Sequence, residues 1–206
     1  MNIGLPRIYL ASQSPRRREL LKQIGIRFEP LLLRSDLRRT VDVDETPHAG
    51  ELPLDYVQRV CHNKAEAGWK TLALRNLPQF PVLAADTTVT LDGKIIGKPD
   101  NNEHATEILR MLSGTQHQVL TAVAVAFRER VEMRLSTTTI TFGTLDDDRI
   151  RRYLLTREAH DKAGAYGIQG YAGAFVKHIE GSYTGVMGLP LFETVELLKL
   201  FGYPAP

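Results

Sequence analysis

The chain has a single cysteine, no long hydrophobic run and almost no net charge. One cysteine, Cys61, excludes an intramolecular disulfide framework and favours a reducing compartment. Because Cys61 lies in a predicted helix, we expect a buried structural thiol rather than a nucleophile. No apolar run approaches the roughly 18 residues that span a bilayer, and the N-terminal residues lack the pattern of a signal peptide. We therefore expect a cytoplasmic protein that does not enter a membrane.

Charge and common motifs exclude further classes. Basic residues number 26 and acidic residues 24, so the net charge of +2 gives no general attraction to nucleic acid or membranes. We expect no stable nucleic-acid binding, and any basic site must be local. The sequence has no Walker sequence, dinucleotide fingerprint, HExxH motif or CxxC pair, which excludes common phosphate and metal sites.

The 206 residues are 43% hydrophobic and 24% charged, which is enough for one sizeable core, and we expect a single domain over 1–206. Strands and helices alternate along the chain, which indicates an α/β protein with a mixed sheet flanked by helices. Strands are predicted at 7–11, 28–33, 82–86, 88–91, 94–97, 118–127, 131–142 and 176–179. Helices are predicted at 15–23 after a Ser14 cap, at 54–74, at 102–112, from a Thr144 cap through 153, and from 190 onward. The polar segment 34–53 is a predicted surface loop.

The segment 11–20, ASQSPRRREL, combines a strand end, two hydroxyl residues and a helix that begins with three arginines, Arg16 to Arg18. A helix N-terminus favours anions and disfavours cations, so these arginines cost stability unless an anion binds there. The pattern predicts a phosphate site. The alternative is a solvated basic face.

Asp86 ends the apolar stretch VLAAD, and we expect the strand to end with it. In open α/β sheets, ligands gather at the carboxyl ends of strands, and an acid after four buried residues is poorly placed for a merely solvated role. Asp86 is the candidate catalytic base or metal ligand. The alternative is a carboxylate that accepts backbone hydrogen bonds from a turn at Thr87 and Thr88.

Other charged residues could complete such a site. A triphosphate carries several negative charges, and Mg²⁺ prefers one or two carboxylates plus phosphate oxygens, so acids and lysines must converge on it together. The candidates are Asp42, Asp44, Glu45, Lys64 and Lys98. Taken singly, each also fits a solvated loop or surface residue.

The stretch 163–175, AGAYGIQGYAGAF, is rich in glycine, which lets a backbone approach a planar or phosphorylated ligand closely. Gln169 offers both an acceptor and donors, and could address the N3–H and a carbonyl of thymine or uracil. The alternative is a flexible loop or a bulged strand.

Eight segments, in this order and spacing, resemble the Maf family of nucleotide pyrophosphatases along nearly the whole chain. They are LASQSPRRRELL, DVDET, NKAEAG, AADTTV, GKP, MLSGTQHQVLTAVAV, DKAGAYGIQG and GSYTGVMGLPL. The resemblance implies a Maf/ITPase-like α/β fold, with a mixed twisted sheet and two lobes around a nucleotide-binding cleft. It also implies a divalent metal cation, Mg²⁺ or Mn²⁺, and hydrolysis between the α and β phosphates to give the monophosphate and pyrophosphate.

Residue roles follow from the same resemblance. Asp86 resembles the proton acceptor that activates water, and with Glu45 it would hold the metal. Ser12, Arg16 and Arg17 resemble the phosphate-binding residues, while Lys64 and Lys98 resemble the remaining catalytic cations.

Substrate choice in the family follows three positions, which are Arg16, Thr87 and Gln169 here. This set resembles the dTTP and UTP subgroup, with modified pyrimidine nucleotides as further candidates. The branch that acts on 7-methyl-GTP tends to carry Trp, Ser and Glu there, and Glu suits the donors of guanine better than a pyrimidine imide.

A regulatory role without catalysis is the alternative hypothesis to an enzyme. Maf proteins are associated with inhibition of septum formation, so the chain could bind nucleotide, or nucleic acid through its arginines at 16–18 and 34–39, without turnover. The segment 34–40, RSDLRRT, is longer and more basic than is usual in the family, and its role stays open. A homodimer is also compatible with the resemblance.

Overall fold

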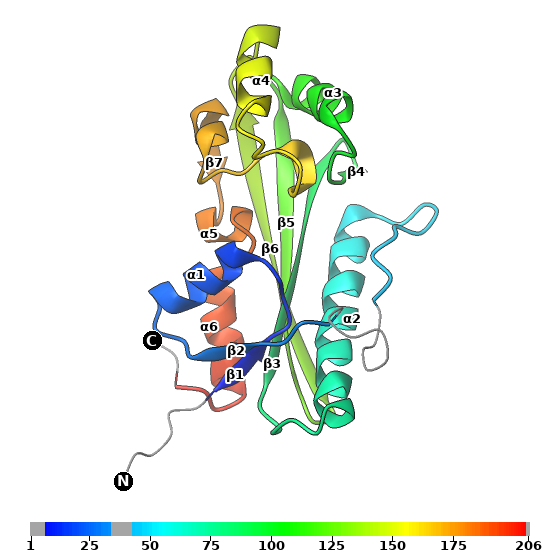
Figure 1. Ribbon diagram of the computed structural model, residues 1–206, viewed down its shortest axis with the longest axis vertical. Helices are drawn as coiled ribbons and strands as arrows, with labels where there is room; N and C mark the ends of the chain where they lie inside the picture. Colours follow the sequence, from blue (N-terminus) through cyan, green and yellow to red (C-terminus); the bar gives the residue numbers. More distant parts are fainter. Residues whose placement is uncertain (1–6, 34–42, 205–206) are drawn as a thin grey trace.

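The computed structural model describes residues 7–33 and 43–204, which form one sheet with helices on both sides and at one end (Figure 1). The strands are β1 (Ile8–Leu10), β2 (Phe28–Pro30), β3 (Val82–Leu91), β4 (Lys94–Ile96), β5 (Gln116–Phe127), β6 (Arg130–Phe142) and β7 (Val176–Glu180). The α-helices are α1 (Pro15–Gln23), α2 (Pro53–Leu74), α3 (Asn102–Leu112), α4 (Asp147–Leu154), α5 (Tyr183–Val186) and α6 (Leu191–Leu200). Two 3₁₀ turns, η1 (Ala163–Ala165) and η2 (Tyr171–Phe175), occupy the glycine-rich stretch.

The sheet is mixed, as predicted. Its strand order is β2-β1-β3-β5-β6-β7, with β4 paired to β3. β1 runs parallel to β2 and β3, whereas the other pairs are antiparallel. The long strands β3, β5 and β6 run the length of the molecule, with α2 on one face and α1 and α6 on the other (Figure 1).

The prediction that a strand ends at Asp86 is wrong, because β3 continues to Leu91. β-branched residues follow Asp86, and β5 pairs with β3 residue by residue from Val82 to Thr90. The turn at residues 87 and 88, which was the alternative, is therefore also absent.

The other edge of β3 explains why a polar residue is tolerated at Asp86. β1 pairs only with Val82 and Leu83, and β4 pairs only from Val89 onward. Among the described strands, nothing pairs with this edge between residues 84 and 88. Asp86 thus lies just beyond the carboxyl end of β1, rather than at the end of its own strand.

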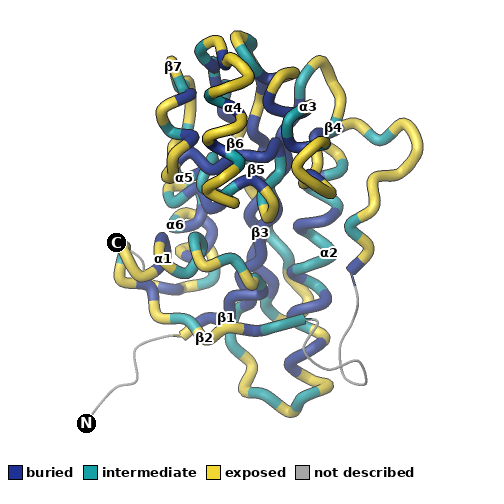
Figure 2. Tube along the Cα trace, turned by 45° about the horizontal axis from the view of Figure 1, so that its top comes forward, coloured by how far each residue is buried: buried dark blue, intermediate teal, exposed yellow. Residues whose placement is uncertain are grey.

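Buried residues, drawn in dark blue, lie along the long strands in the middle of the molecule (Figure 2). Three clusters of buried side chains define two lobes. One cluster lies among α3, α4 and the adjoining ends of the long strands. The other two lie on opposite faces of the sheet, one under α1 and α6 and the other under α2. Ala84, Ala85 and Val89 of β3 belong to three different clusters, so β3 crosses from one lobe to the other at Asp86. The expected two-lobed arrangement is confirmed.

Helix ends show where local reasoning holds and where it fails. Asn101 caps α3 at the predicted start of this helix, and its side chain accepts a hydrogen bond from the backbone N–H of His104. The cap of α4 is Asp146 rather than Thr144, because the Asp146 carboxylate accepts the backbone N–H of Arg149. Ser14 is the N-cap of α1, but its side chain makes no capping bond.

Other boundaries differ little from those expected. β2 ends at Pro30 rather than at residue 33. The Leu31 N–H still donates to the Leu10 carbonyl, but β1 ends at Leu10 and offers no partner beyond it. Asp92 and Gly93 form the predicted tight turn, with φ of 50° and 74°. Cys61 is 0% exposed, and burial raises its pKa to about 12, which confirms a structural thiol. None of the described helices is both long enough and apolar enough to cross a membrane.

Candidate active site

A cavity of about 910 Å³ is lined by residues of both lobes. The nine residues to which the family resemblance assigns a role all line it: Ser12, Arg16, Arg17, Glu45, Lys64, Asp86, Thr87, Lys98 and Gln169. These residues come from α1, α2, β3 and four loops that are far apart in the chain. The structure therefore places them together, while their individual roles stay predictions.

The alternation of side chains along β3 sends two neighbouring residues toward different helices. Asp86 meets Lys64 of α2, with the Lys64 Nζ 2.7 Å from Asp86 Oδ1. Thr87 meets Arg17 of α1, whose Nη2 donates to Thr87 Oγ1 over 3.3 Å. A shift of one residue in the strand would exchange the two and dismantle both contacts.

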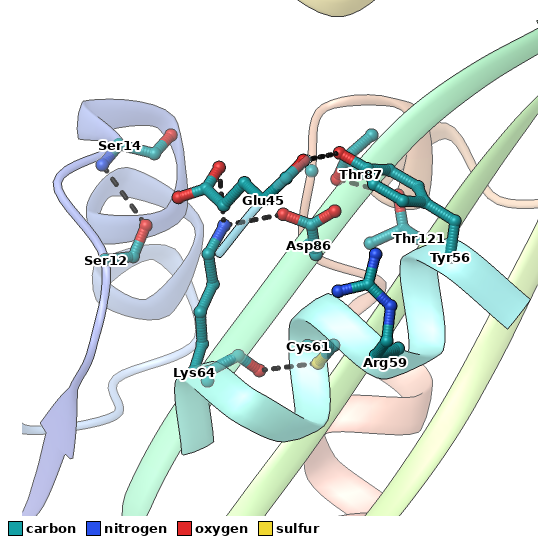
Figure 3. A network of polar contacts seen from close by, with 12 residues as sticks. Ser12, Ser14, Glu45, Tyr56, Arg59, Cys61, Lys64, Asp86, Thr87 and Thr121 are labelled. Carbon is teal, nitrogen blue, oxygen red and sulfur yellow. Dashed lines mark hydrogen bonds and ion pairs between the residues drawn. The ribbon is translucent and has the colours of Figure 1, made fainter. Parts of the chain in front are cut away.

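Two carboxylates converge on one ammonium group (Figure 3). The Lys64 Nζ lies 2.7 Å from Asp86 Oδ1 and 3.3 Å from Glu45 Oε2. The side chains of Lys64 and Asp86 are only 15% and 11% exposed, so each charge needs a partner. Lys64 reduces the repulsion that would otherwise oppose two ionised carboxylates at this distance.

Arg17 is fixed by three hydrogen bonds. Its Nε donates to the Gly188 carbonyl over 2.7 Å, and its Nη1 donates to Ser12 Oγ over 3.0 Å. The third bond is the contact with Thr87 already described. Burial lowers the pKa of Arg17, although nearby Asp86 acts in the opposite direction, and a guanidinium stays charged under such conditions. Arg17 is thus a positive group of the cavity lining that is already oriented before any ligand binds.

Arg16 makes a contact across the two lobes. Its Nη1 lies 3.6 Å from Asp161 Oδ2, and Asp161 precedes η1. Lys162 donates to the Asp161 carboxylate and to the Glu158 carbonyl. Asp161 and Lys162 both line the cavity, but sequence reasoning assigned neither a role. The signal was present in DKAGAYGIQG, where an acid and a lysine directly precede the glycines.

Five basic and three acidic side chains line the described cavity, so it carries a positive excess suited to a polyphosphate. The basic residues are Arg16, Arg17, Lys64, Lys98 and Lys162, and the acidic ones are Glu45, Asp86 and Asp161. Lys98 is exposed at the end of the β4 hairpin. The predicted convergence of acids and lysines is therefore found.

Part of the lining is neutral. Val89, Val119, Tyr166 and Ile168 contribute apolar surface near Gln169, which is exposed. The Tyr166 hydroxyl lies 2.7 Å from Nε2 of the buried His117. Burial lowers the pKa of His117 to about 4, so this imidazole is neutral at ordinary pH. Sequence reasoning missed both residues, although each lies within a quoted motif.

The glycine-rich stretch is organised rather than open. A Cβ on Gly164, which has a φ of 71°, would lie 2.9 Å from Val89 Cγ2. A Cβ on Gly167 would lie 2.7 Å from Lys162 Cε. These glycines thus allow close packing within the protein, which is a different reason from the ligand approach expected from the sequence.

The acidic candidates divide into those that can and cannot serve a cation. Asp86 and Glu45 present carboxylates within reach of one atom, Lys64 Nζ. Two carboxylates fit a hard divalent cation that takes its other ligands from phosphate and water. Asp44 instead accepts the backbone N–H of Thr46 and does not line the cavity. Asp42 and the segment 34–40 lie outside the described residues. In the described part of the chain, no group of three or more His, Cys, Asp or Glu could hold a metal ion.

Comparison with known proteins gives one consistent result. The model of the Maf family, described as Maf-like protein, matches residues 7–201. A relative from Nitrosomonas europaea named dTTP/UTP pyrophosphatase is 58% identical over 95% of this chain and 94% of its own length. Relatives of the same name from Aromatoleum aromaticum and Chromobacterium violaceum are 57% and 50% identical, over 96% and 100% of this chain and 97% and 100% of their own.

Among solved structures, the Staphylococcus aureus Ham1 protein is similar over 66% of this chain and 71% of its own, with a TM-score of 0.46 and 19% identity. That similarity is too weak to assign a shared fold. The family match covers nearly the whole chain, and the three curated relatives are at least half identical to it over almost their full lengths. The chain belongs to the Maf family.

Proposed function

We propose that this protein is a nucleoside triphosphate pyrophosphatase that hydrolyses dTTP and UTP, and modified pyrimidine nucleotides, to the monophosphate and pyrophosphate. The observation that carries the proposal is the nearly buried Asp86 carboxylate, held by Lys64 in a cavity that five basic residues line. Binding alone needs the cations but does not need this carboxylate. The relatives named dTTP/UTP pyrophosphatase support the same activity.

In the proposed reaction, Asp86 takes a proton from a water molecule as the water oxygen attacks the α phosphorus. The bond between the α phosphorus and the bridging oxygen breaks, and that oxygen leaves with pyrophosphate. Arg16, Arg17 and Lys98 stabilise the negative charge that develops on the leaving group. Because Arg17 is fixed before substrate arrives, no reorganisation is needed at that position.

Asp86 and Glu45 are the residues proposed to hold a divalent cation, Mg²⁺ or Mn²⁺. When bound, such a cation would supply positive charge beside the phosphate oxygens and an acidified water ligand. Lys64 keeps the two carboxylates together before the cation and the nucleotide enter.

Base selection is proposed to depend on Gln169, with Arg16 and Thr87 as the other two selective positions. An amide can accept the N3–H of thymine or uracil and donate to an adjacent carbonyl. The neutral surface of Val89, Val119 and Ile168 beside it fits a flat, uncharged ring.

A panel of purified nucleotides tests the proposal. Pyrophosphate and monophosphate are measured for dTTP, UTP, CTP, dCTP, GTP and 7-methyl-GTP, each with Mg²⁺, with Mn²⁺ and with EDTA. We expect metal-dependent release with dTTP and UTP well ahead of the purines. Tight nucleotide binding without release would instead favour the regulator of septum formation.

Three further predictions accompany this function. They are a single domain, a cytoplasmic location and no stable nucleic-acid complex, while a homodimer is compatible with membership of the family. The family match over residues 7–201 supports the first, since one family model spans nearly the whole chain.

A further inference from the structure

The segment that carries Glu45 has no regular secondary structure of its own. Residues 43–52, between the undescribed segment and α2, form no helix or strand. A carboxylate on such a segment points in a fixed direction only if other residues hold its backbone. The residues that do so come from the first turns of α2.

Arg59 of α2 holds the backbone on both sides of Glu45. Its Nη1 donates to the Asp44 carbonyl over 3.3 Å, and its Nη2 donates to the Thr46 carbonyl over 3.0 Å. The remaining donors bind Glu51 at the end of the same segment, with Nε to Oε1 at 2.6 Å and Nη2 to Oε2 at 2.8 Å. A planar guanidinium can make all four contacts at once, whereas an ammonium group cannot.

Tyr56 holds the carbonyl between those two. Its hydroxyl donates to the Glu45 carbonyl over 3.0 Å, and its ring lies 5.7 Å from the Arg59 guanidinium carbon (Figure 3). Three consecutive carbonyls, those of residues 44, 45 and 46, are thus bound by two side chains of α2. Lys64, which receives the Glu45 carboxylate, belongs to the same helix.

The protonation states suit this arrangement. The hydrogen bonds from Arg59 lower the pKa of Glu51 to about 2, so the Glu51 carboxylate stays ionised. Burial raises the pKa of Tyr56 to about 12, and the charges of Asp86 and Glu45 act in the same direction. Tyr56 therefore remains a donor at any pH at which the enzyme is expected to work.

We propose that Arg59, Tyr56 and Glu51 form a clamp that aims the Glu45 carboxylate at Lys64 and Asp86, and that Arg59 is its central positioning residue. This rests on the proposed function, in which Glu45 acts beside Asp86. Arg59 does not line the cavity, so it acts only through the segment that it holds.

The main test combines Arg59→Met with Glu45→Gln. Methionine keeps much of the apolar stem of Arg59 and removes all four hydrogen bonds. We expect kcat to fall about 10- to 100-fold, with KM for UTP changed less than about threefold, as for residues that orient a metal-binding carboxylate. In the Glu45→Gln background, Arg59→Met should lower kcat no further, because the clamp has nothing left to aim.

Two variants control for a merely structural effect. Arg149→Met is the matched control, since Arg149 of α4 likewise donates to a carbonyl, that of Ala174, and packs 5.0 Å from the Phe175 ring. It lies outside the cavity and should leave kcat unchanged. Tyr56→Phe removes one bond of the clamp and keeps the ring, so it should lower kcat about three- to fivefold and serves if Arg59→Met fails to fold.

A second readout does not depend on turnover. Mn²⁺ binding is followed by the electron paramagnetic resonance signal of the free ion. Arg59→Met should weaken it several-fold, no more than Glu45→Gln does, and the double variant should match Glu45→Gln.

The outcomes separate the two proposals. No pyrophosphate release by the wild-type enzyme would end the proposed function, while the Mn²⁺ titration would still test the clamp. An active wild type with a normal Arg59→Met variant, or with losses that add fully in the double variant, would overturn the clamp alone. Full activity of Glu45→Gln would overturn it as well, since there would be no working carboxylate to aim.

Discussion

The two sides of the cavity are built differently. One side, called the charged wall, consists of Ser12, Arg16, Arg17, Glu45, Lys64 and Asp86. The other side carries Lys98, Asp161 and Lys162 as well as the neutral wall, which consists of Val89, Val119, Tyr166, Ile168 and Gln169. Most side chains of the charged wall are bound to one another or to the backbone before any ligand enters. The neutral wall is mainly apolar surface with one exposed amide.

The difference shows how one cavity can meet two demands. Stabilising charge on a transferring phosphate requires groups that are already oriented, because reorganisation raises the barrier. Recognising a flat base requires shape and a few hydrogen bonds. Apart from Arg16, which is one of the three proposed selective positions, changes to the charged wall should therefore act on all nucleotides alike. Changes to the neutral wall should act on the choice among them.

The largest effect is expected for Asp86→Asn. It removes the proton acceptor while keeping the size of the side chain, so kcat should fall about 10²- to 10⁴-fold for every nucleotide. The matched control is Asp148→Asn, because Asp148 of α4 is exposed, pairs with Arg151 and Arg152, and lies outside the cavity lining. Pyrophosphate release and thermal unfolding of both variants are the measurements. Near-normal turnover in a folded Asp86→Asn variant would remove Asp86 from the chemistry.

Arg17→Lys tests whether the charged wall must be preset. Lysine keeps the charge but cannot bind Gly188, Ser12 and Thr87 together. We expect kcat/KM to fall about 100-fold for all nucleotides. Arg18→Lys, one residue along the same helix and outside the cavity lining, should change it little. Equal kinetics for the two variants would mean that charge alone suffices.

The stability of the protein should depend on pH through His117, which is hydrogen-bonded to Tyr166 of the neutral wall. Its folded pKa of about 4 lies below the ordinary 6.5, so the unfolded chain takes up the proton first as pH falls. The contribution of neutral His117 to the free energy of unfolding is fully present above pH 6.5 and is lost as the pH falls from 6.5 to 4. At pH 4.5 the loss amounts to about 2 kcal/mol. Urea unfolding at pH 7 and pH 4.5 should show that His117→Gln loses this part of the pH dependence. The same pH dependence in both proteins would contradict the assignment.

Gln169→Glu tests whether the neutral wall selects among bases. A carboxylate cannot donate to a pyrimidine carbonyl, so kcat/KM for dTTP and UTP should fall about tenfold relative to the purine nucleotides. The ratio of rates across a nucleotide panel is the measurement. A uniform loss would show that Gln169 does not distinguish bases.

The smallest effect is expected for Asp161→Asn, which weakens the ion pair that Asp161 forms with Arg16 across the two lobes. Asp161 places a negative charge beside Arg16 and Lys162, two cations that face the cavity. Its neutralisation should lower KM for UTP about two- to threefold, a size that fits a partly exposed ion pair. An increase in KM would show that Asp161 supports binding instead.

The mixed sheet and most of the helices could be predicted from local patterns, because they depend on short motifs that retain their local structure. The nine lining residues came from such motifs together with the resemblance to the Maf family. Positions set by distant partners could not be predicted. The unpaired edge of β3 at Asp86 depends on where β1 stops pairing and β4 begins, and the orientation of Arg17 depends on Gly188, which is 171 residues away.

The Arg59 clamp could not be predicted from the sequence for the same reason. Arg59 looks like an ordinary charge on a helix until the fold brings the carbonyls of residues 44 and 46 to it. Asp161 and Lys162 stood in a quoted motif, but only their place opposite Arg16 shows that they belong to the cavity.

The central claim is that water attacks the α phosphorus within this cavity. The most direct measurement is hydrolysis of UTP by the wild-type enzyme in ¹⁸O-enriched water with Mg²⁺, with mass spectrometry of both products. The account predicts one ¹⁸O atom in UMP and none in pyrophosphate. Label in pyrophosphate, or the release of UDP and inorganic phosphate, would contradict it.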